Sequence, residues 1–188
     1  MQLRVISGLA RGKRLKVPKG NIRPLSEQSR EALFNILAPV IFDSVFLDLY
    51  AGSGAVGIEA LSRGAKLAIF VELDQKSVMV IRENLENTGF SDRAEVFALP
   101  VERGLKILNK KNAKFDIIFL GAPYGSRSLY DALKFIGSAD LLNPTAVVIA
   151  EHRFKQIIDP VYGKLGKFRE QRYGDTIFSF YTVEQVNK

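Results

Sequence analysis

The sequence predicts an α/β domain built on a mainly parallel sheet with helices on both faces. Between residues 45 and 150, short apolar runs alternate with segments of helical periodicity, which is the pattern of parallel strands joined by crossover helices. A chain of 188 residues, 47% of them hydrophobic, is long enough to bury one core. Two strand-like runs near the C-terminus flank a Gly-Asp turn, which indicates a hairpin that adds one antiparallel strand.

The N-terminal segment predicts a small β-hairpin. Residues 3–6 and 13–17 read as two short strands, and the glycines of segment 8–12 supply the turn between them. Prolines and glycines between residues 18 and 24 break the chain and indicate a linker. Ser26 can then cap a helix that runs through Leu37, because apolar residues recur at core spacing and Pro39 follows the end.

The alternating region supplies the sheet and its covering helices. Apolar runs predict strands at 45–47, 67–71, 94–98, 117–120 and 146–150. Helical periodicity predicts helices at 55–63, 75–88, 101–109 and 127–138, with Asp74 as the cap of the second. The terminal hairpin is predicted at 168–173 and 176–181.

Composition narrows the classes of function. The absence of cysteine excludes disulfides, zinc–thiolate sites and thiol nucleophiles. The single histidine, His152, follows a strand and is expected to be structural, so we expect no metal site. No apolar run approaches the roughly 20 residues that cross a bilayer, and the polar N-terminus does not read as a signal peptide. We therefore expect a cytoplasmic protein that acts away from membranes.

The net charge of +7 arises entirely from the first 23 residues. This segment holds seven basic and no acidic residues, whereas the rest of the chain carries 20 of each. A one-sided basic segment is typical of contact with a nucleic-acid backbone; a solvated surface face is the alternative. We expect a basic hairpin extension with its linker over 1–24 and the main domain over 25–188. The residues expected to contact nucleic acid are Arg4, Arg11, Lys13, Arg14, Lys16 and Arg23.

A glycine-rich loop follows the first strand of the alternating region. Gly52, Gly54 and Gly57 satisfy G-x-G-x-x-G between a strand and a helix, which predicts a nucleotide-type cofactor but also fits a dinucleotide site or a helix-packing cluster. Asp48 lies four residues before the loop, where it would hold the loop or a ligand ammonium and would repel a pyrophosphate. Glu72 ends the next strand, where a carboxylate can bind ribose hydroxyls; an ordinary surface glutamate is the alternative.

These features favour S-adenosylmethionine over NAD. Apolar residues after the third strand, at 99–101, are expected to pack on the adenine ring. The full set of expected cofactor residues is Asp48, Tyr50, Ala51, Gly52, Ser53, Gly54, Gly57, Glu72, Leu73, Pro100 and Val101.

Several segments together resemble the RsmD family of bacterial small-subunit rRNA guanine-N2 methyltransferases. The resemblance rests on residues 4–8, Arg23-Pro24, residues 30–35 (Arg-Glu-Ala-Leu-Phe-Asn), the 48–57 loop and residues 59–64 (Glu-Ala-Leu-Ser-Arg-Gly), and covers nearly the whole chain. It implies a class I methyltransferase (Rossmann-like) fold with a seven-stranded sheet and an RNA-contacting N-terminal hairpin. It also implies S-adenosylmethionine as methyl donor, S-adenosylhomocysteine as product, and ribosomal RNA or a small-subunit assembly particle as the partner of a monomer.

One motif departs from this resemblance. Such enzymes carry Asp-Pro-Pro-Tyr after the fourth strand, whereas this chain reads Gly121-Ala122-Pro123-Tyr124. The family aspartate accepts a hydrogen bond from the target amine, and the aromatic ring stacks on a base that has left its helix. Gly121 offers only backbone groups, and neither Asp116 nor Glu151 obviously substitutes.

Three readings of this departure remain open: a compensated enzyme, a binding protein that keeps cofactor and RNA but catalyses poorly, and an altered sequence. Rebuilding the motif with Gly121→Asp and Ala122→Pro is expected to raise the rate sharply. An NAD-linked oxidoreductase is a more distant alternative, because the chain is too short for a second nucleotide or substrate domain.

Overall fold

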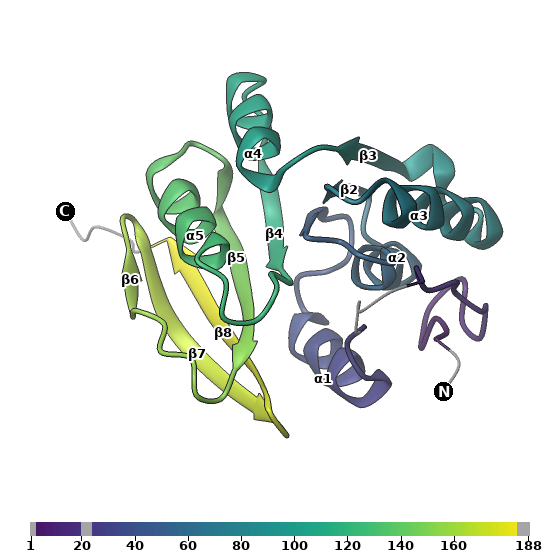
Figure 1. The fold of residues 1–188 in the computed structure, drawn as a ribbon, viewed down its shortest axis with the longest axis horizontal. Coiled ribbons are helices and arrows are strands. Elements are labelled where there is room, and N and C mark those ends of the chain that lie inside the picture. Colours follow the sequence, from purple (N-terminus) through teal and green to yellow (C-terminus); the bar gives the residue numbers. More distant parts are fainter. Residues whose placement is uncertain (1–2, 20–23, 184–188) are drawn as a thin grey trace.

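The computed structural model describes residues 3–19 and 24–183 and places an eight-stranded mixed sheet at the centre of the domain (Figure 1). The strand order is β3-β2-β1-β4-β5-β8-β7-β6. The strands are β1 (Val45–Leu49), β2 (Leu67–Glu72), β3 (Ala94–Ala98), β4 (Phe115–Leu120), β5 (Leu142–Arg153), β6 (Val161–Tyr162), β7 (Leu165–Tyr173) and β8 (Thr176–Val183). The helices are α1 (Glu27–Leu37), α2 (Ala55–Ser62), α3 (Gln75–Thr88), α4 (Val101–Lys110) and α5 (Ser128–Ser138), with a short 3₁₀ turn at Ser91–Arg93.

The C-terminal part of the sheet is more extensive than the sequence predicts. Strands β1 to β5 are mutually parallel, β8 is antiparallel to β5, and the β8–β7 and β7–β6 pairs are antiparallel as well. The prediction of seven strands was therefore one short, because Val161 and Tyr162 turn back through Gly163 and pair with β7. The fifth strand also runs to Arg153, well past residue 150, since β8 pairs with its polar end.

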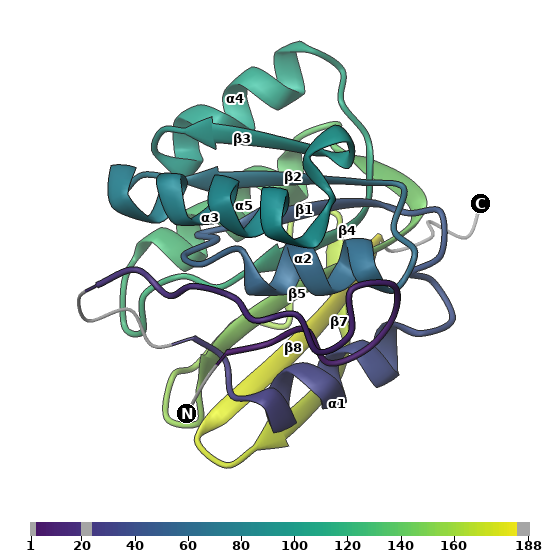
Figure 2. The ribbon, with the colours of Figure 1, turned by 90° about the vertical axis from the view of Figure 1, so that its right-hand side faces the viewer.

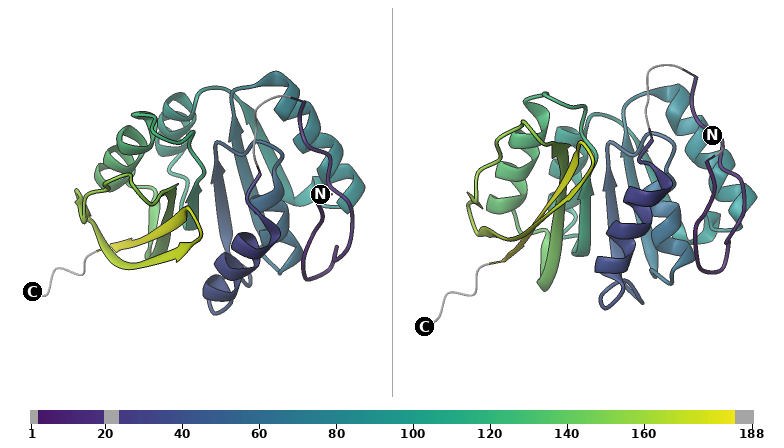
Figure 3. Two further views of the ribbon diagram at one scale, coloured as in Figure 1. Left: turned by 60° about the horizontal axis from the view of Figure 1, so that its bottom comes forward. Right: turned by 90° about the horizontal axis from the view of Figure 1, so that it is seen from below.

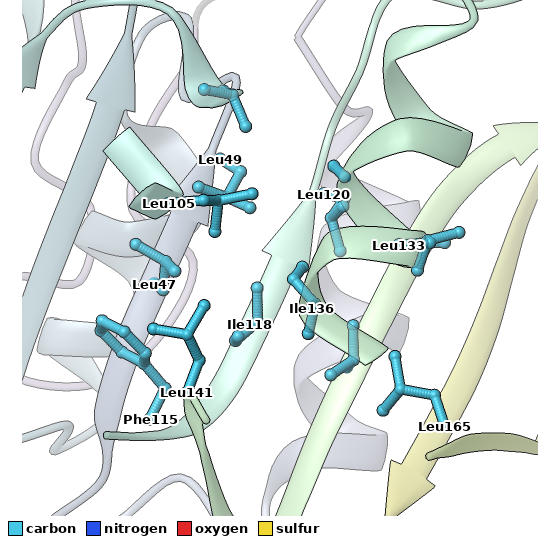
Figure 4. Packing of buried hydrophobic residues seen from close by; sticks show 14 of the residues in the cluster. Leu47, Leu49, Leu105, Phe115, Ile118, Leu120, Leu133, Ile136, Leu141 and Leu165 are labelled. Carbon is cyan, nitrogen blue, oxygen red and sulfur yellow. The ribbon is translucent and has the colours of Figure 1, made fainter. Parts of the chain in front are cut away.

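Helices cover both faces of the sheet, as predicted (Figure 3). One core lies under α4 and α5, where Leu105, Leu133 and Ile136 pack on alternate residues of β1 and β4 (Figure 4). The other core lies under α1, α2 and α3 and includes Phe34 and Phe70. Alternate strand residues face opposite sides, so a sheet that buries both faces needs nearly continuous apolar strands, which this chain supplies.

The helix caps follow the sequence closely. The Ser26 side chain accepts a hydrogen bond from the backbone N–H of Ser29, and Asp74 does the same for Ser77. These contacts satisfy backbone donors that have no partner inside the helix. Helix α3 ends at Gly89, which takes the left-handed conformation at φ 81°.

The N-terminal segment 3–19 packs along α2 and α3 as an irregular loop (Figure 2). The hairpin that the sequence predicts pairs over a few residues only: Arg4 and Arg14 form an isolated antiparallel bridge, the Val5 N–H donates to the Lys13 carbonyl, and the Leu15 N–H donates to the Leu3 carbonyl. Side chains of the helices satisfy other backbone donors: Glu59 accepts from the N–H groups of Ile6 and Ser7, and further donors pair with Ser62 and Asn84.

Apolar side chains fix this segment to the domain. Val5, Ala10 and Leu15 are buried in the same core as α1 and α2. Whether residues 1–24 behave as a separate extension stays a prediction.

Candidate active site

A cavity of about 1220 Å³ opens where the parallel strands end, between the loops that follow β1, β2, β3 and β4. The two crossovers diverge there, since β1 lies between β2 and β4 in the sheet, and ligands of open α/β sheets bind at such a switch point. Its walls come from residues that are far apart in sequence: Tyr50, Gly52, Glu72–Lys76, Pro100–Glu102, Leu105, Gly121–Tyr124, Ser128, Asp131, Ala132 and Glu151.

The glycine loop forms one wall through a run of unusual backbone angles. Tyr50, Gly52 and Gly54 have φ values of 61°, 56° and 75°, in the left-handed region, which glycine enters without strain and tyrosine enters at a cost. Among the predicted loop residues, Tyr50 and Gly52 line the cavity. Ala51, Ser53, Gly54 and Gly57 lie behind them and shape the turn into α2.

Asp48 and Gly57 fasten the loop to the sheet. The Asp48 carboxylate is buried, and its Oδ2 accepts a hydrogen bond of 2.9 Å from the Gly57 N–H. A Cβ on Gly57 would lie 2.3 Å from the Phe70 ring, so glycine is needed for α2 to approach β2. Burial raises the pKa of Asp48 to about 8, and the charges of Glu72 and Glu151 add to the rise. Of the two roles predicted for Asp48, the structure places it where it holds the loop.

Glu72 joins the loops after β1 and β2. Its Oε2 accepts from the Gly52 N–H at 2.8 Å, and its Oε1 accepts from the Asp74 N–H at 2.9 Å. Each carboxylate oxygen retains a lone pair for a further donor. Leu73 is 62% exposed beside it. Pro100 and Val101 begin α4 and form the apolar side of the same cavity.

The cavity is acidic although the protein is basic overall. Five of its lining residues are carboxylates, namely Glu72, Asp74, Glu102, Asp131 and Glu151, and one, Lys76, is basic. Two of these carboxylates, Glu72 and Glu151, lie close enough to raise the pKa of the buried Asp48. Such a field stabilises a cationic ligand and opposes an anionic one.

The segment 121–124 forms the opposite wall. The Gly121 N–H donates to the Leu49 carbonyl at 3.1 Å, Ala122 is buried, and Tyr124 is 41% exposed. The Tyr124 hydroxyl donates to Glu151 Oε1 at 2.5 Å, while the guanidinium of Arg153 lies 5.0 Å from the centre of its ring. Burial and the Glu151 charge raise the pKa of Tyr124 to about 12, so the phenol stays protonated.

Sequence reasoning considered Glu151 as a substitute for the missing aspartate but did not assign it to the site. Leu120 of β4 pairs in register with Ala150 of β5, so Gly121, the first residue after β4, lies beside Glu151, which is still within β5. Burial raises the pKa of Glu151 to about 7, although the Tyr124 hydrogen bond opposes the rise. The signal that could have found it was this carboxylate at the carboxyl end of a strand adjoining the altered motif.

The predicted nucleic-acid residues that fall within the described ranges lie on the surface beside α1, α2 and α3. Arg4 pairs with Glu27, Lys16 pairs with Glu83, and Lys13 donates to the Asn87 carbonyl. Arg11 and Arg14 are exposed as well. Arg11 lies in the turn that meets Ser62, at the end of α2 away from the glycine loop. Arg23 lies outside the described residues. The contact of all six predicted residues with nucleic acid stays a prediction.

His152 is buried, and its Nε2 lies 2.9 Å from the Ser179 hydroxyl, in a structural setting. Burial lowers its pKa. Across residues 3–19 and 24–183, no cluster of three or more His, Asp or Glu side chains is arranged to hold a metal ion. The helices in these same ranges are all too short or too polar to cross a membrane.

Comparison with known proteins agrees with this architecture. A family model described as conserved hypothetical protein 95 matches residues 3–182. The Bacillus subtilis protein named "Putative rRNA methyltransferase YlbH" is 35% identical over 180 residues, which cover 95% of this chain and 98% of the relative. The Escherichia coli "Ribosomal RNA small subunit methyltransferase D" is 31% identical over 184 residues, with coverages of 97% and 91%.

A solved structure titled "Putative methyltransferase yhhF from Escherichia coli" superimposes with a TM-score of 0.85 at 30% identity and covers 98% of this chain and 99% of its own. The sheet is thus that of a class I methyltransferase, with a parallel core and antiparallel C-terminal strands. Since the family model spans nearly every residue, the chain belongs to the conserved hypothetical protein 95 family of RsmD- and YlbH-like methyltransferases.

Proposed function

We propose that this protein transfers a methyl group from S-adenosylmethionine to the exocyclic N2 of a guanine in small-subunit ribosomal RNA. The observation that carries the proposal is the acidic cavity at the switch point of the sheet, bordered by the glycine loop and by Tyr124. The name of the Escherichia coli relative supports ribosomal RNA of the small subunit as the substrate. Action in the cytoplasm, as a monomer, belongs to the same proposal.

The residues of the cavity fit S-adenosylmethionine. This cofactor carries a sulfonium and an ammonium, which the surrounding carboxylates stabilise, whereas a pyrophosphate would meet five carboxylates and one lysine. The free lone pairs of Glu72 suit the ribose hydroxyls, and Pro100, Val101 and Leu105 offer an apolar surface to adenine. When bound, the cofactor supplies an electrophilic methyl group. NAD fits this site poorly.

The substrate side is the corner formed by Gly121, Pro123 and Tyr124. The Tyr124 ring, which is 41% exposed and has Arg153 over it, can stack on a base that has left its helix. Removing a base from its stack costs a few kcal/mol. We propose that stacking on Tyr124 and phosphate contacts from the basic N-terminal segment offset this cost.

A methyl-transfer assay tests the proposal. The protein would be incubated with S-adenosylmethionine labelled in the methyl group and with small-subunit RNA, both naked and in particles from bacteria that lack a homologue. Label on one guanine N2 is the expected result, together with calorimetric binding of S-adenosylhomocysteine and none of NAD. Tight binding of NAD alone would overturn the cofactor assignment.

Gly121 favours a second function, that of a binding protein, because glycine lacks the side-chain acceptor for the exocyclic amine of the target guanine. A protein that binds cofactor and RNA but transfers methyl groups poorly would give binding in both assays and little label. That outcome would replace the enzyme assignment by a binding role.

A further inference from the structure

Gly121 leaves the cavity wall without a side chain at this position, and the Glu151 side chain lies next to it. A Cβ built on Gly121 would lie 3.1 Å from Phe119 Cε1, 3.8 Å from the Tyr50 carbonyl oxygen and 3.6 Å from Glu151 Oε2. The nearest polar side-chain atom to the position of the missing group is therefore a carboxylate oxygen. This oxygen belongs to Glu151 of the neighbouring strand β5, which lies outside the sequence motif at 121–124.

One oxygen of the Glu151 carboxylate is fixed by a hydrogen bond, and the other can accept one. Its backbone continues β5 one residue beyond the pairing of Ala150 with Leu120. The Tyr124 hydroxyl donates to Oε1 at 2.5 Å and fixes the carboxylate. Within the described residues Oε2 receives no hydrogen bond, and Glu151 lines the cavity together with Gly121 and Tyr124. One oxygen is thus anchored, and the other lies 3.6 Å from where a Cβ of residue 121 would stand.

We propose that Glu151 supplies the carboxylate that residue 121 lacks, accepting the hydrogen bond and then the proton of the guanine N2 amine, with Tyr124 as its positioning residue. This inference rests on the proposed function. In the transfer, the N2–CH₃ bond forms as the S–CH₃ bond breaks with its electron pair left on sulfur. The proton of the amine passes to Glu151 Oε2 and from there to water. Atoms and charge balance without a further reactant.

The electrostatics of the site agree with this role. A proton acceptor works best when its pKa lies near the working pH, and burial raises the pKa of Glu151 to about 7. The ionisable groups near it are Asp48 on β1, whose pKa the Glu151 charge raises, and Tyr124 after β4, with Arg153 of β5 over the Tyr124 ring. A cation bound in the cavity lowers the pKa of Glu151, so the carboxylate is ionised when the donor is present.

The inference changes the expected effect of rebuilding the family motif. An aspartate at 121 beside Glu151 would put two carboxylates in contact, which raises the pKa of one of them. Gly121→Asp in the otherwise native chain is therefore expected to bring no gain in rate. In a Glu151→Gln background the repulsion is absent, and the same aspartate is expected to restore transfer.

The test is a set of three variants assayed with labelled S-adenosylmethionine and the small-subunit RNA. Glu151→Gln keeps an acceptor for Tyr124 but loses the charge, and kcat is expected to fall about 10²–10³-fold with little change in the KM for RNA. The rise of kcat with pH should disappear; in the native protein it is expected below about pH 7, because the bound cationic donor lowers the pKa of Glu151. Adding Gly121→Asp to Glu151→Gln should recover at least about tenfold, whereas the exposed control Glu95→Gln should leave kcat unchanged.

Two readouts separate chemistry from folding. Glu151→Gln should unfold thermally at the same temperature as the native protein. Its Kd for S-adenosylhomocysteine, measured by calorimetry, should lie within about threefold of the native value. In Glu151→Gln, loss of the neighbouring negative charge should lower the pKa of Tyr124. Ultraviolet titration of the phenol measures this change. Native-like kcat in Glu151→Gln, or no recovery on adding Gly121→Asp, would overturn the role of Glu151 while methyl transfer by the native protein stands. A native protein without transfer would instead overturn the proposed function.

Discussion

Replacing Glu59 by glutamine is expected to destabilise the protein far more than any surface change. The Glu59 carboxylate is fully buried, and its oxygens accept from the Ile6 N–H at 2.8 Å, the Ser7 N–H at 3.0 Å and Arg63 Nε at 2.8 Å. Arg30, also fully buried, places Nε 3.9 Å from Glu59 Oε2. Burial lowers the pKa of Arg30, and the charge of Glu59 opposes that effect. Glu59 is therefore the main compensation for a buried guanidinium.

The magnitude follows from the charge left behind. Removing one partner of a buried ion pair typically costs about 3–5 kcal/mol, because the other charge stays buried without compensation. Within the described residues, Nε and Nη1 of Arg30 lack hydrogen-bond partners, so without Glu59 only the Arg4 carbonyl, which accepts from Nη2, and the charge of Glu27 would stabilise the guanidinium. Since a domain is stable by only about 5–15 kcal/mol, Glu59→Gln should fold but unfold at a much lower urea concentration.

Urea unfolding at pH 7, followed by circular dichroism, measures the effect. Glu83→Gln is the matched control, because Glu83 also pairs with the N-terminal segment, through Lys16, but on the exposed surface, where a pair contributes about 0–1 kcal/mol. Adding Arg30→Met to Glu59→Gln should recover part of the loss by removing the uncompensated charge. Hydrogen exchange at Ile6 and Ser7 should quicken. If Glu59→Gln costs no more than Glu83→Gln, the buried-charge reasoning is wrong.

Three further results are expected. Because the pKa of Asp48 is raised in the fold, its stabilising contribution is present below about pH 4 and is lost as pH rises through about 8; Asp48→Asn should flatten this decline in urea unfolding. Gly57→Ala should destabilise by about 1–3 kcal/mol, measured in the same way, because its methyl group would overlap the Phe70 ring; an unchanged midpoint would contradict that packing. Replacing Arg11 and Arg14 by alanine should weaken RNA binding and flatten its salt dependence, whereas an unchanged salt slope would remove these residues from the RNA contact.

Much of the fold could be predicted because local patterns and tertiary packing agree. Ser26 and Asp74 cap the helices that their positions predict, and the apolar runs become the parallel strands. The N-terminal strands are shorter than predicted, because alternation in the sequence does not reveal that Glu59 accepts from the N–H groups of Ile6 and Ser7. The complete burial of Arg30 against the same glutamate is likewise invisible in the sequence.

The site was predictable where its residues adjoin in sequence. The glycine loop, Glu72 and Tyr124 could be placed from motif spacing, and all three border one cavity. Glu151 could not, because its relation to Gly121 exists only through the pairing of β4 with β5. The acidic character of the cavity was hidden for a similar reason: its carboxylates come from α3, α4, α5 and two strand ends of a chain whose overall charge is positive.

The way the first residues are held has a consequence for synthesis of the chain. Segment 3–19 leaves the ribosome before its partners Glu59, Ser62 and Asn84, which lie 52 to 68 residues further along. Until α3 has been made, Val5 and Leu15 lack part of the core that buries them, and the six positive charges of the segment travel with them. This segment therefore remains an unprotected, basic stretch of nascent chain and docks only after α3 has emerged.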